Sequence, residues 1–203
     1  MDVVLAGRAG WTPLDLAHAF LDGGATVVQL RAKQLDSSAF LELADAAVRL
    51  AHSYQANIIV NDRVDIALMS GAAGVHVGQD DLPAAAARRL LGEKALIGLS
   101  THTLDQIDGA VSEPVNYVAV GPVFGTRSKE TGYDAVGLDL VGSAARKAHD
   151  KPIVGIGGIT LENSQSVISA GATAVAIISD LLVGSDPRGR TAAFVRRLEQ
   201  NRV

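Results

Sequence analysis

Short runs of β-branched and other apolar residues alternate along this chain with longer segments whose apolar residues recur at helical spacing. The short runs predict strands at residues 3–6, 26–31, 57–61, 74–78, 95–100, 117–120, 152–156 and 173–178. The longer segments predict helices at residues 12–24, 36–51, 64–70, 82–92, 104–111, 138–149 and 191–201, and residues 157–163 lead into a further helix that ends at Gly171. A repeated order of strand and then helix implies a parallel sheet with helical crossovers.

The number of repeats selects one architecture within the α/β class. Eight strand–helix units close a (β/α)8 TIM barrel, and about 200 residues is the small end of that class. We therefore expect one TIM barrel domain over residues 1–203. The alternative is an open, doubly wound sheet, but no loop after a predicted strand carries the GxGxxG pattern of that fold.

Composition excludes several classes of function. The 203 residues include no cysteine, so disulfides, thiolate nucleophiles and cysteine-ligated metals are ruled out. The net charge is −4 with scattered Lys and Arg, so we expect no nucleic-acid partner. No apolar run approaches the ~20 residues of a membrane span, and the first residues lack the basic charge of a signal peptide. We therefore expect a cytoplasmic protein.

In such barrels the functional site lies at the C-terminal ends of the strands. The second predicted strand leads into Gln29, Arg31 and Lys33, which share one face because side chains alternate along a strand. Two unpaired cations at a barrel mouth would be costly, and a bound anion would satisfy them. The alternative is an internal layer of salt bridges.

Two carboxylates follow the next two strands. Asp62 comes after the third predicted strand, and Asp81 follows the fourth. Together they predict a Mg²⁺ site, because Mg²⁺ takes one or two carboxylates and completes its shell with water and phosphate oxygens. The competing interpretation is helix capping, with Asp62 capping the helix at 64 and Asp81 the helix at 82.

The loop after the sixth predicted strand carries the largest group of polar side chains, within residues 121–129. Its hydroxyls and cations suit a phosphate ligand, although a solvated loop would have similar residues. The four side chains concerned are Thr126, Arg127, Ser128 and Lys129.

Ser100 ends the fifth predicted strand, where its hydroxyl could bind a ligand or cap the next helix. His76 and His102 lack the partners of a metal site or a catalytic triad. His76 lies in mid-strand, so we expect a packed and hydrogen-bonded histidine.

A second anion site is predicted at the last two strands. Gly158 follows the seventh strand, and Ile178 and Ser179 end the eighth. The loops after strands seven and eight commonly form a phosphate cup from backbone N–H groups. Two anion sites suggest two phosphorylated substrates or one bisphosphate, and a diphosphate beside the metal would be a leaving group. No side chain is placed as a covalent nucleophile.

Taken together, these segments resemble thiamine-phosphate synthase over nearly the whole chain. The matching segments are QLRAK (29–33), ND (61–62), GVHVGQDD (74–81), GLSTHT (98–103), GPVFGTRSK (121–129), IGGI (156–159) and AIIS (176–179). The resemblance implies a TIM barrel enzyme that joins a pyrimidine diphosphate, 4-amino-2-methyl-5-(diphosphooxymethyl)pyrimidine, to a thiazole phosphate, 4-methyl-5-(2-phosphoethyl)thiazole or its carboxylated form. The products would be thiamine phosphate and diphosphate, formed by a Mg²⁺-assisted dissociative mechanism.

The resemblance also assigns the site residues. It implies that Mg²⁺ binds Asp62 and Asp81, and that Arg31, Lys33, Ser100 and Lys129 are catalytic. The pyrimidine diphosphate would contact Gln29, Leu30, Arg31, Ala32, Lys33, Asn61, Ser100 and Lys129. The thiazole phosphate would contact Thr126, Arg127, Ser128, Gly158, Ile178 and Ser179. The expected partners are these small molecules, with no nucleic acid and no membrane, and a homo-oligomer stays open.

The chain departs from the family pattern in places. Ser128 stands where threonine is common, Gly125 where proline is common, and the opening segment is short. One alternative is the related thiazole tautomerase, but Pro122 occupies the position of its histidine. Another is a phosphate-binding barrel that regulates without catalysis, against which Asp62, Asp81 and Lys129 argue.

Overall fold

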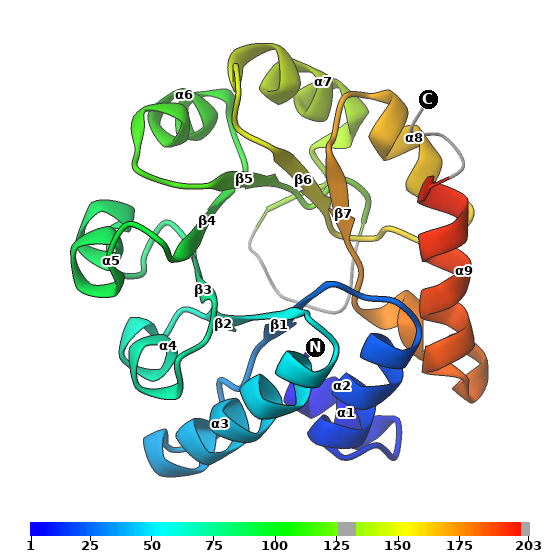
Figure 1. Ribbon diagram of the computed structural model, residues 1–203. Helices are drawn as coiled ribbons and strands as arrows, with labels where there is room; N and C mark the ends of the chain where they lie inside the picture. Colours follow the sequence, from blue (N-terminus) through cyan, green and yellow to red (C-terminus); the bar gives the residue numbers. More distant parts are fainter. Residues whose placement is uncertain (126–132, 200–203) are drawn as a thin grey trace.

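Seven parallel strands arranged about a common centre form the middle of the protein, and helices surround them (Figure 1). The computed structural model describes residues 1–125 and 133–199. Within these residues every strand pairs with its neighbours in the sequence, in the order β1 to β7. The strands are β1 Val27–Leu30, β2 Asn57–Asn61, β3 Gly74–Val77, β4 Leu96–Thr101, β5 Tyr117–Val120, β6 Ile153–Ile156 and β7 Ala174–Ala176. This sequential parallel order places the C-terminal ends of the strands on one side of the molecule.

Helices follow the strands, and the apolar spacing predicts most of them. Their bounds are α1 Val3–Arg8, α2 Pro13–Asp22, α3 Ser37–Ser53, α4 Val64–Ser70, α5 Ala84–Leu91, α6 Leu104–Ser112, α7 Gly137–Lys147, α8 Ser164–Ser169, the 3-10 helix η1 Ser179–Ser185 and α9 Pro187–Glu199. Side-chain caps fix several of the starts: Thr12 accepts the Asp15 N–H, and Asp36 accepts the Ala39 N–H.

The first predicted strand is wrong, because residues 3–8 form α1. The Asp2 carboxylate accepts the backbone N–H groups of Val4 and Leu5, which satisfies two donors that a helix start leaves free. Asp2 is also joined to Arg31 by a single parallel bridge beyond the end of β1. The predicted α/β class and parallel sheet are therefore confirmed. The eight strands of a (β/α)8 barrel are not, because the described residues contain seven strands.

The C-terminal region also differs from the prediction. The segment after β7 turns into η1, and the last helix begins at Pro187 rather than at residue 191. Asp186 accepts the Gly189 N–H just before this helix, and proline suits the first position of a helix.

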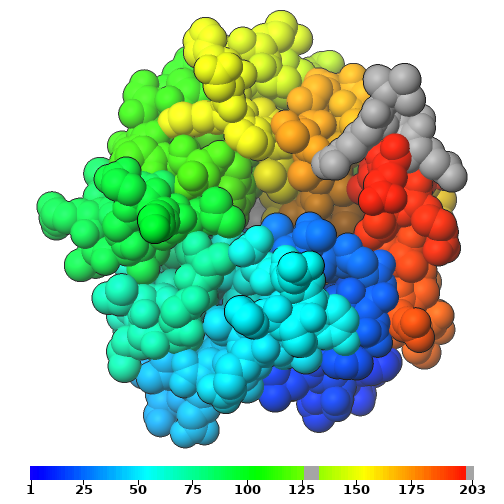
Figure 2. Space-filling model, viewed as in Figure 1, coloured from blue at the N-terminus to red at the C-terminus, as the bar shows by residue number. Residues whose placement is uncertain are grey.

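The hydrophobic core lies between the sheet and the surrounding helices. Val28 and Leu30 of β1 are buried there, together with Val60, Val75 and Val118 from other strands. Because side chains alternate along a strand, burial of Val28 and Leu30 against the helices directs Gln29 to the opposite face, inside the ring of strands. On the face seen in Figure 2, side chains fill nearly all of the space that the helices enclose.

None of the helices in residues 1–125 and 133–199 is long and apolar enough to cross a membrane.

Candidate active site

A chain of hydrogen bonds joins side chains from four strands inside the ring. The Gln29 side chain on β1 hydrogen-bonds the Tyr117 hydroxyl on β5. His76 on β3 lies 3.0 Å from that hydroxyl through Nδ1 and 2.8 Å from the Ser100 Oγ on β4 through Nε2. His76 is only 6% exposed, so the prediction of a packed and hydrogen-bonded histidine is confirmed. These contacts show that Gln29 and Ser100 both face the interior.

The directions of these hydrogen bonds follow from the chemistry of the groups. Burial raises the pKa of the Tyr117 hydroxyl, which therefore stays protonated at neutral pH. The Gln29 amide donates to the Tyr117 oxygen, so the hydroxyl is free to donate to His76 Nδ1. That assignment leaves the proton of a neutral imidazole on Nε2, from which it is donated to Ser100. The serine hydroxyl can then donate in turn to a ligand.

The Tyr117 ring occupies space that only glycine leaves open on the neighbouring strand. Gly98 is paired with Tyr117 in the sheet register, and a Cβ atom on Gly98 would lie 2.1 Å from the Tyr117 Cζ. Any side chain at position 98 would therefore displace the ring and the hydrogen bonds that it makes.

Both cations that follow β1 have carboxylate partners. Arg31 forms an ion pair with Asp2 through Nη1, and Lys33 Nζ lies 3.1 Å from Asp62 Oδ2. These pairs correspond to the salt-bridge alternative in the sequence analysis. The guanidinium is nevertheless incompletely satisfied, because the buried Arg31 Nε has no hydrogen-bond partner in the part of the chain that the structure describes. A buried donor without a partner is costly, so Arg31 retains capacity for an added acceptor.

The capping interpretation of the two aspartates is wrong. The residue that precedes α4 as its N-cap is Arg63, which makes no side-chain cap, and Pro83 has the same position before α5. Asp62 instead adopts a left-handed backbone conformation, with φ of 64°. The Asp81 Oδ2 accepts the Gly78 N–H at 2.7 Å and so closes the turn after β3.

The described residues contain no group of three or more His, Asp or Glu side chains that could hold a metal alone. Asp62 and Asp81 follow β2 and β3, which pair in parallel, so both lie on the side where the strands end. Two carboxylates fit a Mg²⁺ ion that takes its remaining ligands from water and phosphate.

The loop after β6 packs against the chain that follows β5. Gly157 and Gly158 both have positive φ, and a Cβ on Gly158 would lie 2.6 Å from the Gly125 carbonyl oxygen. Asn163 Nδ2 donates to the Gly158 carbonyl at 3.1 Å. The N–H groups of Gly158 and of Ser179, the first residue of η1, find no acceptor within residues 1–125 and 133–199. Free N–H groups of this kind can bind an anion.

Four predicted site residues, Thr126, Arg127, Ser128 and Lys129, lie outside the described residues. The chain on either side of them contacts β4 and the segment after it. The His102 ring stacks on Tyr133 with centroids 4.0 Å apart, and His102 Nδ1 lies 2.5 Å from the Gly121 carbonyl oxygen. Both flanks of the segment therefore lie near the C-terminal end of β4.

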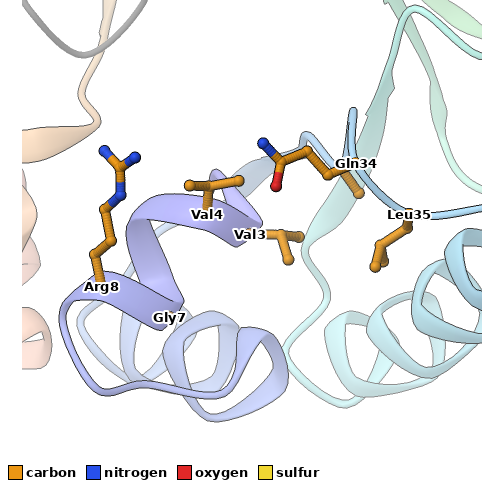
Figure 3. Close-up of a pocket in the computed structure, with 7 residues that line it drawn as sticks. Val3, Val4, Gly7, Arg8, Gln34 and Leu35 are labelled. Atoms are coloured by element: carbon orange, nitrogen blue, oxygen red, sulfur yellow. The ribbon is translucent and has the colours of Figure 1, made fainter.

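A pocket of about 310 Å³ lies between α1 and the segment after β1 (Figure 3). Its lining is mostly apolar, with Arg8 and Gln34 as the polar side chains. Of the predicted site residues the lining includes Ala32, so this pocket lies beside the predicted diphosphate site rather than within it.

Sequence reasoning missed three residues of this region. Asp2 pairs with Arg31 across a long separation in the chain, and the Asx-type cap before α1 was the available signal. Tyr117 lies on the same face of β5 as Ala119, so strand alternation could have placed its ring inside. Asp180, which is buried within η1, gives no local signal of its contacts.

Comparison with known proteins identifies the family of the chain. A model of the family described as thiamine monophosphate synthase matches residues 3–181. A thiamine-phosphate synthase of Roseiflexus castenholzii (strain DSM 13941 / HLO8) is 44% identical over 181 residues, which are 89% of this chain and 79% of that protein. A thiamine-phosphate synthase of Moorella thermoacetica (strain ATCC 39073 / JCM 9320) is 42% identical over 199 residues, or 98% of this chain and 92% of that protein.

A solved structure supports the same grouping. The thiamine phosphate pyrophosphorylase from Pyrococcus furiosus superposes with a TM-score of 0.86 and 29% identity, covering 93% of this chain and 90% of that chain. Similarity of sequence and of backbone thus extends over most of the chain, including every strand that carries a predicted site residue. The chain therefore belongs to the thiamine monophosphate synthase family.

Proposed function

We propose that this protein is a transferase that joins the pyrimidine diphosphate named above to the thiazole phosphate, releasing diphosphate and forming thiamine phosphate. The observation that carries the proposal is the family match over residues 3–181, which includes the segments after β1 to β7. Relatives named thiamine-phosphate synthase at 42–44% identity support it.

The end of β1 is suited to the diphosphate. Arg31 and Lys33 bring two positive charges, and the buried Arg31 Nε–H can donate a hydrogen bond to a diphosphate oxygen. Lys129 would add a third charge, as the family resemblance implies. Cations near a departing diphosphate stabilise the charge that develops on it, which lowers the barrier to bond breaking.

Asp62 and Asp81 would hold Mg²⁺ next to these cations. Their number and type fit the ion when phosphate oxygens complete its shell. When bound, the cation would supply charge neutralisation at the leaving group without proton transfer. Asp62 would exchange its contact with Lys33 for the metal, and Lys33 would then be released towards the diphosphate.

The interior hydrogen-bond chain would position the pyrimidine. Ser100 is held by His76, which is held in turn by Tyr117 and Gln29, so the hydroxyl has a fixed direction. Fixed polar groups of this kind align the methylene carbon of the pyrimidine, which carries the diphosphate, with the thiazole nitrogen. The bond from that carbon to the diphosphate oxygen breaks first, and the thiazole nitrogen then attacks the carbon.

The thiazole phosphate would bind at the other side of the ring. The N–H groups of Gly158 and Ser179, which find no acceptor among the described residues, support an anion site at the ends of β6 and β7. We call Gly158, Ile178 and Ser179 the phosphate cup. Residues 126–128 would contribute further contacts, as the family resemblance implies.

A turnover assay tests the proposal. Purified protein with both substrates and Mg²⁺ should form thiamine phosphate and diphosphate in equal amounts, and omission of either substrate should abolish both products. Use of the carboxylated thiazole in parallel would define the preferred substrate. Isomerisation of the thiazole alone, without formation of thiamine phosphate, would instead identify a tautomerase. Binding of both substrates without any reaction would identify a regulator.

A further inference from the structure

Asp180 joins two segments that are far apart in the sequence and lie side by side at the ends of β6 and β7. It belongs to η1 and is only 8% exposed. Its Oδ2 accepts the backbone N–H of Leu161, from the loop after β6, at 3.1 Å. The carboxylate therefore fixes the distance between the loop that carries Gly158 and the segment that begins with Ser179.

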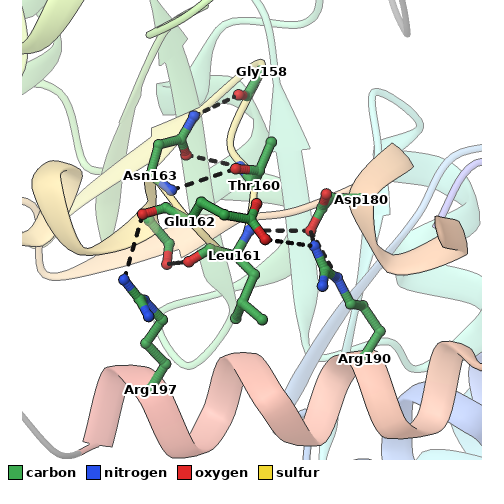
Figure 4. Close-up of polar contacts among 9 residues, drawn as sticks. Gly158, Thr160, Leu161, Glu162, Asn163, Asp180, Arg190 and Arg197 are labelled. Atoms are coloured by element: carbon green, nitrogen blue, oxygen red, sulfur yellow. Dashed lines mark hydrogen bonds and ion pairs between the residues drawn. The ribbon is translucent and has the colours of Figure 1, made fainter. Parts of the chain in front are cut away.

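Arg190 of α9 holds the same carboxylate from the other side (Figure 4). Its Nε and Nη2 donate to Asp180 Oδ2 at 3.0 Å and 2.7 Å, which is a short, charge-assisted contact. Glu162 lies 3.5 Å from the same guanidinium. One arginine thus contacts acidic groups from both segments, because Glu162 neighbours Leu161 in the loop after β6.

The loop that Asp180 holds is itself internally fixed. Asn163 accepts the Thr160 N–H at 2.8 Å through Oδ1 and donates to the Gly158 carbonyl through Nδ2. Figure 4 shows this arrangement next to the Asp180–Arg190 pair. Because Asn163 fixes the Gly158 carbonyl, a displacement of Leu161 would move Gly158 as well.

We propose that Asp180 and Arg190 are positioning residues for the phosphate cup: they hold Gly158 and Ser179 at the separation that binds the phosphate of the thiazole substrate. This rests on the proposed function. Neither side chain needs to touch the substrate. A neutral side chain at position 180 would lose the ion pair with Arg190. The loop after β6 would then be held less firmly against η1, while the strands stay paired.

Steady-state kinetics with each substrate varied in turn test the assignment. Asp180→Asn keeps the size of the side chain but removes the charge that Arg190 binds. We expect it to raise KM for the thiazole phosphate about ten-fold or more and to leave KM for the pyrimidine diphosphate within about two-fold. Calorimetric binding of the thiazole phosphate alone should weaken in the same proportion.

Two further variants complete the experiment. Arg190→Lys retains the positive charge but loses the paired N–H donors, so it should also raise KM for the thiazole phosphate. This variant replaces Asp180→Asn in the test if Asp180→Asn fails to fold. Asp108→Asn is the matched control, since Asp108 pairs with Lys147 at 2.6 Å between α6 and α7. That control should leave both KM values unchanged.

The outcomes separate the two proposals. Equal changes in both KM values, or a lower melting temperature with unchanged thiazole KM, would overturn the positioning role while an active wild-type enzyme kept the proposed function. A wild-type protein that forms no thiamine phosphate would overturn the proposed function, and the positioning role with it.

Discussion

Lys33 and Asp62 are joined by an ion pair of 3.1 Å between Nζ and Oδ2, across the ends of β1 and β2. Each is assigned to a ligand of opposite charge, Lys33 to a diphosphate and Asp62 to a cation. When both ligands bind, two charges that satisfy one another in the structure would exchange partners together. The ion pair therefore neutralises each of these two charges until the ligands bind.

Replacement of the metal-site aspartates should abolish most activity. Asp62→Asn and Asp81→Asn keep the shape of the side chain but remove the charge that would hold Mg²⁺. We expect each to lower the rate of thiamine-phosphate formation at limiting Mg²⁺ by about 10²-fold or more. Asp65→Asn, which changes the exposed partner of Arg63, is the control and should retain activity. Near wild-type rates for both site variants would show that these aspartates are structural.

Removal of the Lys129 charge should act on catalysis more than on binding. The side chain is assigned to the departing diphosphate, where charge is greatest as the bond breaks. We expect Lys129→Ala to lower kcat by about 10²-fold with little change in KM for the thiazole phosphate. Single-turnover rates would separate this chemical effect from product release. An increase in the thiazole KM at constant kcat would contradict the assignment.

Addition of a methyl group to Gly98 should destabilise the fold. Its Cβ would lie 2.1 Å from Tyr117 Cζ, so the ring must move. We expect Gly98→Ala to lower the free energy of unfolding by about 1–3 kcal/mol, as measured by urea denaturation. Gly109→Ala is the opposite case: nothing lies within 4 Å of its added Cβ in α6, so helix propensity should raise stability by about 1 kcal/mol.

Loss of the Tyr117 hydroxyl should affect both stability and turnover. Tyr117→Phe keeps the ring beside Gly98 but leaves His76 Nδ1 and the Gln29 side chain without that partner. We expect a loss of about 1–3 kcal/mol in the free energy of unfolding, because a buried polar group is left unsatisfied. KM for the pyrimidine diphosphate should rise, since Ser100 is no longer held in one direction. An unchanged unfolding curve would show that water replaces the hydroxyl.

Much of the fold could be predicted from the sequence because local signals agree with the tertiary structure. The bounds of β2, α4 and β5 match the predicted ranges 57–61, 64–70 and 117–120. The segment at 3–6 failed because a run of four apolar residues fits either a strand or a helix. The Asp2 cap favours the helix, because its carboxylate accepts the N–H groups of Val4 and Leu5. These contacts are seen only in the structure.

The positions of the site residues could also be predicted in part, but their contacts could not. The strand ends that carry Arg31, Asp62 and Ser100 could be located, since parallel strands end on one side of the sheet. The partners could not be predicted, because the Arg31–Asp2 and Asp180–Arg190 pairs depend on how whole elements pack. The ligands assigned to residues 126–129 stay predictions.

The left-handed backbone of Asp62, with φ of 64°, has a consequence for laboratory evolution. A residue with a Cβ in this conformation costs about 1 kcal/mol or more relative to glycine. Asp62→Gly would relieve this backbone conformation, but it would also delete the carboxylate that pairs with Lys33. Because the same carboxylate is the proposed Mg²⁺ ligand, any heat-resistant variant with a changed residue 62 should be assayed for thiamine-phosphate formation.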